Sequence, residues 1–158
     1  MPCSQIELEQ VPTQTVIGKM QSVTWGEVAP VITKMRTDAR QHFADAGAEG
    51  GRELTSFLNQ TPEGADVLVG LEVTDPKGSP AISDGFTASV VSPPGTYMKD
   101  EHNGKPGVAP WIGFMARLTN DGYKFENQDG SMSMFEVYSG QGGAETVTMY
   151  AAVVIPAT

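Results

Sequence analysis

The sequence predicts an α+β domain made of two diverged β-α-β-β modules, which span approximately residues 1–93 and 94–158 and are related by pseudo-two-fold symmetry. In this fold an antiparallel sheet carries two long helices on one face. Three observations predict it: an internal repeat, an amphipathic helical pattern in each copy, and strand patterns on both sides of each helix. The length of 158 residues fits one such domain.

An eight-residue stretch occurs twice. Residues 28–35 read VAPVITKM and residues 108–115 read VAPWIGFM, so five of the eight positions are identical. Upstream, Lys19 and Lys99 keep the same separation. Two shorter pairs follow in the same order: Leu71–Val73 with Phe135–Val137, and Ala88–Pro93 with Ala151–Pro156. Collinear matches of this kind indicate a duplication.

Each module is predicted to begin with strand structure and to continue into an amphipathic helix. Strand patterns occur at Ile6–Leu8 and Thr15–Val23 in the first module, and at Thr96–His102 in the second. Proline suits the first turn of a helix, and glycine often follows its last residue. The helices are therefore expected from Pro30 to near Gly47 and from Pro110 to near Gly122.

Two strands joined by a hairpin loop are predicted after each helix. They are Val67–Thr74 with Phe86–Val91, and Met132–Tyr138 with Thr146–Ile155. The linking residues 75–80 and 139–143 are dense in residues that set the special backbone angles of turns. The order β-α-β-β is thus expected twice.

The first module is predicted to contain an insertion. The eight-residue stretch is separated from its partner in the second module by more residues than the two later repeats are from theirs, so the first module has extra residues between its helix and its next strand. The polar stretch Ala48–Asp66 is the expected place. We expect a mobile surface excursion with a short helix around Arg52–Leu58, and a lid over a groove is one role for it.

The composition excludes several classes of function. The 19 acidic and 10 basic residues give a net charge of −9, so no direct nucleic-acid partner is expected. One cysteine, Cys3, and two histidines are too few for a zinc-type site, and neither a metal nor a cofactor is expected. No apolar run suits a signal peptide or a bilayer span, which predicts a cytoplasmic protein with no membrane partner.

The sequence shows no catalytic signature. It has no nucleophile elbow, phosphate-binding loop or metal motif, and neither His42 nor His102 has a neighbouring group suited to acid–base catalysis. We therefore assign no catalytic residue and expect a binding protein more than an enzyme.

The predicted strand that contains Glu136 places a carboxylate among aromatic and thioether groups. Strand alternation puts Met132, Met134, Glu136 and Tyr138 on one face. We interpret this face as a pocket wall for a lipophilic cation, because the carboxylate neutralises its charge, the ring attracts it and methionine adapts to its shape. A solvated sheet face is the alternative interpretation.

The opposite face of these strands is expected to lie under the helices. In the two modules it carries Val67, Val69, Leu71 and Val73, and Ser133, Phe135 and Val137. Four further residues complete the predicted ligand-binding set: Trp111, Phe114, Tyr97 and Glu72.

Two of these four are chosen from the repeat. Trp111 replaces Val31, and a large aromatic residue gained in one copy serves either the groove or the core. Glu72 matches Glu136, with a solvated sheet face again as the alternative. Trp25, which precedes the first helix, is interpreted as structural.

The motifs, taken in order, resemble the gyrase-inhibitor-like effector-binding domains found at the C-terminus of AraC/Rob-type and multidrug-responsive transcription regulators. The resemblance covers nearly the whole chain. It rests on four motifs: Ile6–Leu8 with a following strand, His102–Gly104 before the second helix, Phe135–Tyr138, and Val153–Pro156.

The resemblance implies a groove between the two modules that binds hydrophobic, often cationic, small organic molecules. It also implies an acidic residue in the Glu-x-Tyr strand, here Glu136. The Gly-Pro-Tyr usual after the histidine is replaced by Gly104–Gly107, and no DNA-binding helices precede the domain, so a standalone binding protein is expected. The alternatives are a hydrolase that uses the groove carboxylate, and an inhibitor of a protein partner such as gyrase.

Overall fold

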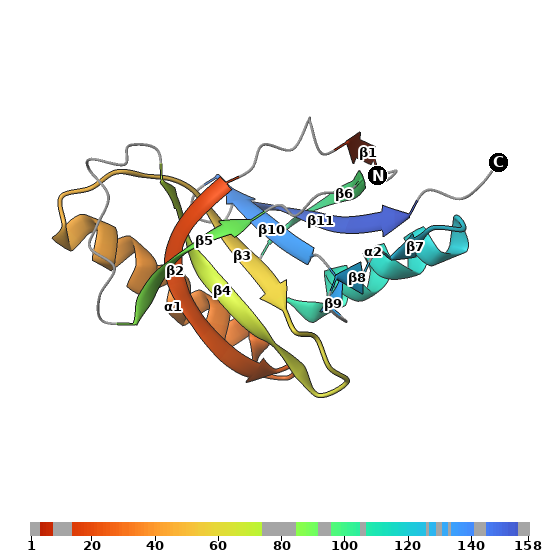
Figure 1. The fold of residues 1–158 in the computed structure, drawn as a ribbon, viewed down its shortest axis with the longest axis horizontal. Helices are drawn as coiled ribbons and strands as arrows, with labels where there is room; N and C mark the ends of the chain where they lie inside the picture. Colours follow the sequence, from red (N-terminus) through yellow and green to blue (C-terminus); the bar gives the residue numbers. More distant parts are fainter. Residues whose placement is uncertain are drawn as a thin grey trace.

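In the computed structural model, antiparallel strands form one large sheet that carries both helices on the same face (Figure 1). The structure describes residues 4–7, 14–73, 85–91, 96–104, 107–125, 127–128, 131–132, 134–140 and 145–154. The helices are α1 (Val28–Asp45) and α2 (Val108–Asn120). The strands are β1 (Ser4–Glu7), β2 (Gln14–Thr24), β3 (Gly50–Leu58), β4 (Gly64–Val73), β5 (Phe86–Val91), β6 (Thr96–Asn103), β7 (Lys124–Phe125), β8 (Asn127–Gln128), β9 (Ser131–Met132), β10 (Met134–Ser139) and β11 (Thr146–Val154).

The strand order of the main sheet is β1-β6-β11-β10-β3-β4-β2-β5, with β7 paired to the end of β11. Every pairing is antiparallel, and β8 and β9 form a separate two-stranded sheet. The central six strands read the same from either end, as β6-β11-β10 from one end inward and β2-β4-β3 from the other. In each set of three, the outermost strand precedes the helix in sequence, the innermost follows it, and the strand between them comes last. At the two ends of this order, β1 pairs with β6, and β5 pairs with β2.

The helices lie where the sequence predicts them. Each begins two residues before its proline, so that Pro30 and Pro110 occupy the first turn, where the missing N–H costs no helical hydrogen bond. Gly47 and Gly122 follow the last turns with φ of +65° and +89°, the left-handed conformation that favours glycine. Both helix ends are therefore set by local sequence.

The main core joins the two helices to the sheet. Apolar residues of both helices pack on side chains of β3, β4, β10 and β11 in one cluster, which includes Ile32 and Met35 of α1 and Phe114 and Leu118 of α2. A second cluster packs on the other face of the sheet: Val16, Leu54, Leu68, Tyr97, Phe135, Val137 and Ala152. Both faces of the central strands are therefore apolar.

The predicted insertion is wrong. Residues 48–66 contain β3, which lies at the centre of the sheet between β10 and β4, so neither a lid nor a helix around Arg52–Leu58 is present. Side chains of β3 are buried on both faces, as Leu54 and Phe57 illustrate. The buried apolar side chains of β3 hold this segment in the sheet, although the segment as a whole has a polar composition.

Because the prediction did not include β3, several of the predicted strand pairings are also wrong. The strand of Glu72 is β4 and the strand of Glu136 is β10, and these strands occupy different places in the sheet order, so the two residues are not equivalent. The strand Phe86–Val91 pairs with β2 instead of forming a hairpin with β4. The proposed loop at 75–80 lies outside the described residues, whereas the hairpin of β10 with β11 is confirmed.

The predicted faces are correct in one half only. Val67 and Val69 lie under the helices as expected, but Phe135 and Val137 point to the opposite side of the sheet. The helix-bearing face of β10 instead carries Met134, Glu136 and Tyr138. Strand alternation identified these groups correctly, and the assignment of which group faces the helices was reversed. Among the described residues, no helix has the length and apolar character needed to cross a membrane.

Candidate functional site

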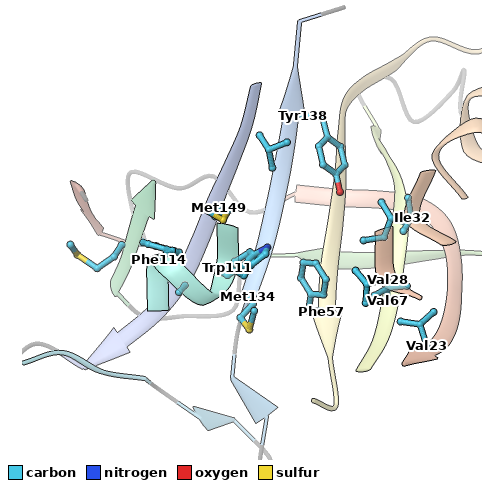
Figure 2. Packing of buried hydrophobic residues seen from close by; sticks show 14 of the residues in the cluster. Val23, Val28, Ile32, Phe57, Val67, Trp111, Phe114, Met134, Tyr138 and Met149 are labelled. Atoms are coloured by element: carbon cyan, nitrogen blue, oxygen red, sulfur yellow. The ribbon is translucent and has the colours of Figure 1, made fainter. Parts of the chain in front are cut away.

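A cavity of about 430 Å³ lies where the first turns of both helices meet β3 and β10. Its lining is apolar and aromatic apart from Gln60, and consists of Trp25, Val28, Phe57, Gln60, Gly107, Val108, Trp111, Ile112, Met115 and Met134. Figure 2 shows three of these side chains, Phe57, Trp111 and Met134, gathered between the sheet and the start of α2. Phe57 and Trp111 meet edge to face, with their ring centroids 5.6 Å apart. Among the described residues no ionisable side chain belongs to this lining, so the cavity suits a hydrophobic ligand.

Glu136 lies directly behind the cavity wall, on the helix-bearing face of β10. Its neighbours across the sheet are Met149 of β11 and Thr55 of β3. The side chain is 0% exposed. The indole Nε1–H of Trp111 donates to Oε2 at 2.9 Å, and the phenol O–H of Tyr138 donates to Oε1 at 2.7 Å. Each carboxylate oxygen thus accepts one hydrogen bond from an aromatic residue.

Burial raises the pKa of Glu136 from its ordinary value of 4.5 to about 7. The hydrogen bonds from Tyr138 and Trp111 and the positive charge of Arg36 oppose this rise in pKa and only partly offset it. In the described part of the chain no ion pair involves Glu136. The site therefore holds a carboxylate that exchanges its proton near neutral pH and has no bonded cation.

Tyr138 connects this carboxylate to a charged region. Its hydroxyl lies 2.5 Å from the Thr55 Oγ1, and burial raises the pKa of the phenol well above its ordinary value. The Arg36 guanidinium lies over the ring, 3.9 Å from the centroid. A cation stacked on this ring is thus already part of the structure.

A second cavity, of about 410 Å³, opens on the far side of Tyr138 and is polar. Arg36 lines this cavity. Its guanidinium donates hydrogen bonds to both carboxylate oxygens of Glu145, at 2.7 and 2.6 Å, and to Glu53 at 2.7 Å. Arg40 adds a further bond to Glu53. The hydrogen bond from Arg36 holds the pKa of Glu145 below its ordinary value. These charges compensate one another within the protein.

Four of the predicted site residues are brought together: Glu136 and its two hydrogen-bond donors, Trp111 and Tyr138, with Met134 in the cavity wall. Phe114 is fully buried behind Trp111, at a centroid distance of 5.8 Å, and serves the core.

The remaining predicted residues lie elsewhere. Tyr97 packs against Phe135 on the opposite face of the sheet, because odd-numbered residues of β6 point away from the helices. Glu72 lies on β4 and forms a salt bridge with Arg52 of β3, with the Arg52 Nε 2.7 Å from the Glu72 Oε1. Met132 belongs to β9, outside the main sheet, and its side chain is not among the described ones.

The sequence reasoning missed several residues that border the site. Trp25 was interpreted as structural, yet it lines the cavity while its Nε1 donates to the Thr61 carbonyl at 2.9 Å. Phe57 and Thr55 were hidden in the stretch taken as an insertion. The β-branched Thr55 and the aromatic Phe57, between Leu54 and Leu58, were the signal for this strand.

Comparison with solved structures identifies the fold. The chain is similar to SAV2435 bound to tetraphenylphosphonium, with 10% identity and a TM-score of 0.57 over 97% of this chain and 93% of that one. It is similar to a protein of Staphylococcus aureus MU50 assigned to bacterial transcription regulation, with 12% identity and a TM-score of 0.57 over 96% of each chain. It is also similar to the EcmrR C-terminal domain, with 17% identity and a TM-score of 0.57 over 97% of this chain and 96% of that one. No protein-family model matches the sequence, and no curated protein matches it.

Proposed function

Since the chain has the gyrase-inhibitor-like effector-binding fold, we propose that it binds small lipophilic aromatic cations in the apolar cavity, with Glu136 as the acidic group that favours positive charge. One observation carries this proposal. A fully buried carboxylate, with no ion-pair partner among the described residues, lies behind a wall of aromatic and apolar side chains.

The energetic argument concerns the cost of that carboxylate. An ionised group in an apolar interior costs several kcal/mol unless a partner compensates it. Two neutral hydrogen-bond donors, Trp111 and Tyr138, leave the pKa raised, so compensation within the protein is incomplete. A hydrophobic cation in the adjoining cavity supplies the missing charge, and burial of its apolar body in the lining adds about 25 cal/mol per Å².

The comparison with SAV2435 supports the class of ligand. That protein was solved with tetraphenylphosphonium, a hydrophobic cation with four aromatic rings, and its fold covers nearly all of this chain. At 10% identity the support comes from the fold alone, and the chemistry of Glu136 and Trp111 is the independent support from this chain.

We also propose that the cavity lies between two copies of one ancestral unit, within a single domain whose halves meet between β5 and β6. The strand order of the central sheet reads the same from both sides. The repeated eight-residue stretch begins at Val28 and Val108, and these residues are the first of the two helices. The first turns of both helices border the cavity, as a groove between two modules requires.

Calorimetric titration with tetraphenylphosphonium tests the binding function. The Glu136→Gln variant keeps the shape of the side chain and removes its charge, so its affinity for the cation should fall roughly tenfold or more. Glu63→Gln, at an exposed turn, is the control for the loss of one negative charge. Equal affinity for the cation in the wild type and in Glu136→Gln would show that Glu136 does not contribute to binding.

The pH dependence is a second measurement on the same complex. The ionised form of Glu136 attracts the cation, and its pKa is about 7. Affinity should therefore rise roughly tenfold between pH 6 and pH 8, with uptake of the cation releasing a proton at the lower pH. A flat profile would mean that this carboxylate does not titrate in the site.

A further inference from the structure

Trp111 separates the cavity from Glu136. The residue lines the cavity, and its Nε1–H donates to the carboxylate at 2.9 Å. Glu136 itself is fully buried and is not part of the lining. The other carboxylate oxygen is taken by the Tyr138 hydroxyl. A molecule in this cavity therefore meets the indole and not the carboxylate.

We propose that the charge of the ligand is recognised through the Trp111 ring, which stays bonded to Glu136 while the cation lies over it. Trp111 is then the residue that sets specificity, and Glu136 is a positioning residue that acts through it. The preferred ligands are cations without hydrogen-bond donors, such as quaternary ammonium and phosphonium ions. This inference rests on the proposed function and names its ligand class.

The chemistry of the lining supports this preference. A primary ammonium or a guanidinium loses its hydrogen bonds to water on entry, and the lining residues that the structure describes offer it no ionised acceptor. A quaternary cation has no such bonds to lose, and an indole face is the strongest aromatic partner for it. The hydrogen bond from Nε1 to an anion also shifts electron density into the ring, because linked polar groups polarise one another.

Fluorinated tryptophans test the ring directly. The chain has two tryptophans, so in the Trp25→Phe protein the analogue enters only at residue 111. The probes are trimethylphenylammonium and tert-butylbenzene, which have the same shape and differ in charge. Stepwise fluorination withdraws density from the ring face, so the ratio of the cation affinity to the neutral affinity should fall about tenfold across the series. Fluorination of Trp25 in the Trp111→Phe protein is the matched control and should leave its own ratio within about twofold.

Two further measurements separate this inference from the proposed function. Benzyltrimethylammonium should bind roughly tenfold more tightly than benzylammonium, and Glu136→Gln should lower the cation-to-neutral ratio. If the ratio ignores fluorination but collapses in Glu136→Gln, the cation has displaced the indole and pairs directly with the carboxylate. That result overturns the inference and leaves the proposed function standing. If no cation binds more tightly than its neutral isostere, both fail.

Discussion

Replacing Glu136 with Gln is expected to stabilise the protein at alkaline pH. The carboxylate is fully buried, and burial is the largest cause of its raised pKa. Above that pKa the folded protein must hold a desolvated negative charge, which the unfolded chain exposes to water. Gln has nearly the same shape and no charge, so the substitution removes this cost.

The magnitude follows from the pKa. A folded-state pKa of about 7 against an ordinary value of 4.5 means that the folded protein retains a proton that the unfolded chain has lost. The stability from this proton is fully present below about pH 4.5, is lost as the pH rises through 7, and is absent above about pH 8. At about 1.4 kcal/mol per pH unit the loss is on the order of 3 kcal/mol. Gln accepts only one of the two hydrogen bonds, which costs about 1 kcal/mol and leaves a gain of about 2 kcal/mol at pH 8.

Urea unfolding of the wild type and of Glu136→Gln at pH 5, 6, 7 and 8, followed by circular dichroism, measures this difference. The free energy of unfolding of the variant should exceed that of the wild type by about 2 kcal/mol at pH 8, and the advantage should disappear by pH 5. Glu63→Gln controls for the change in net charge. A difference that does not change with pH, or a variant that is less stable at pH 8, would refute the assignment of a buried titrating carboxylate.

Three other predictions follow from the packing. Arg36→Met removes the cation shared by two carboxylates and should lower the free energy of urea unfolding by about 3 kcal/mol, whereas Arg40→Met, at an exposed residue, should cost less than about 1 kcal/mol. A Cβ at Gly70 would lie 2.2 Å from a carbonyl oxygen of β2, so Gly70→Ala should lower the melting temperature strongly, and Gly26→Ala, which meets no atom within 4 Å, should not. Hydrogen exchange should find the amides of β3 among the slowest in the protein, because this strand is central, and rapid exchange there would contradict the sheet order.

The sequence predicted what local rules determine. Proline and glycine marked the ends of both helices, and alternation of side chains grouped Met134, Glu136 and Tyr138 on one face. Trp111 was singled out for the groove or the core from a substitution within the repeat, since only one copy gains a large aromatic residue there. Its hydrogen bond to Glu136 was not predicted.

The failures arose where long-range pairing decides the outcome. Strand β3 contains the polar residues Thr55 and Ser56 in a polar stretch of sequence, and its neighbours in the sheet bury them. Because the prediction omitted this strand, it treated Glu72 as the equivalent of Glu136, and the two residues lie on strands that are not equivalent. Tyr97 shows the second limit, because alternation identifies two faces of a strand and does not tell which one the helices cover.

The two halves of the sheet each carry a glutamate on the helix-bearing face, and the two glutamates differ in their hydrogen-bond donors, which are charged for Glu53 and neutral for Glu136. On β3, Glu53 is bonded to Arg36 and Arg40 of α1, and Arg36 also stacks on the Tyr138 ring. The protein thus already holds a flat, delocalised cation between carboxylates and an aromatic ring. On β10, Glu136 faces α2 instead, where Trp111 supplies a hydrogen bond and no charge.

This asymmetry is consistent with the proposed binding function, in which the charge of Glu136 serves a ligand. Arg36 is close enough to lower the pKa of Glu136 but bonds to other carboxylates, so the pKa stays near 7. A Gln at this residue is predicted to make the domain more stable at neutral pH, so the carboxylate carries a predicted cost in stability. Stability given up at one buried residue beside an open apolar cavity is the pattern expected of a binding site. On the proposed function, the charge that completes Glu136 is that of a cation bound in the cavity that Trp111 lines.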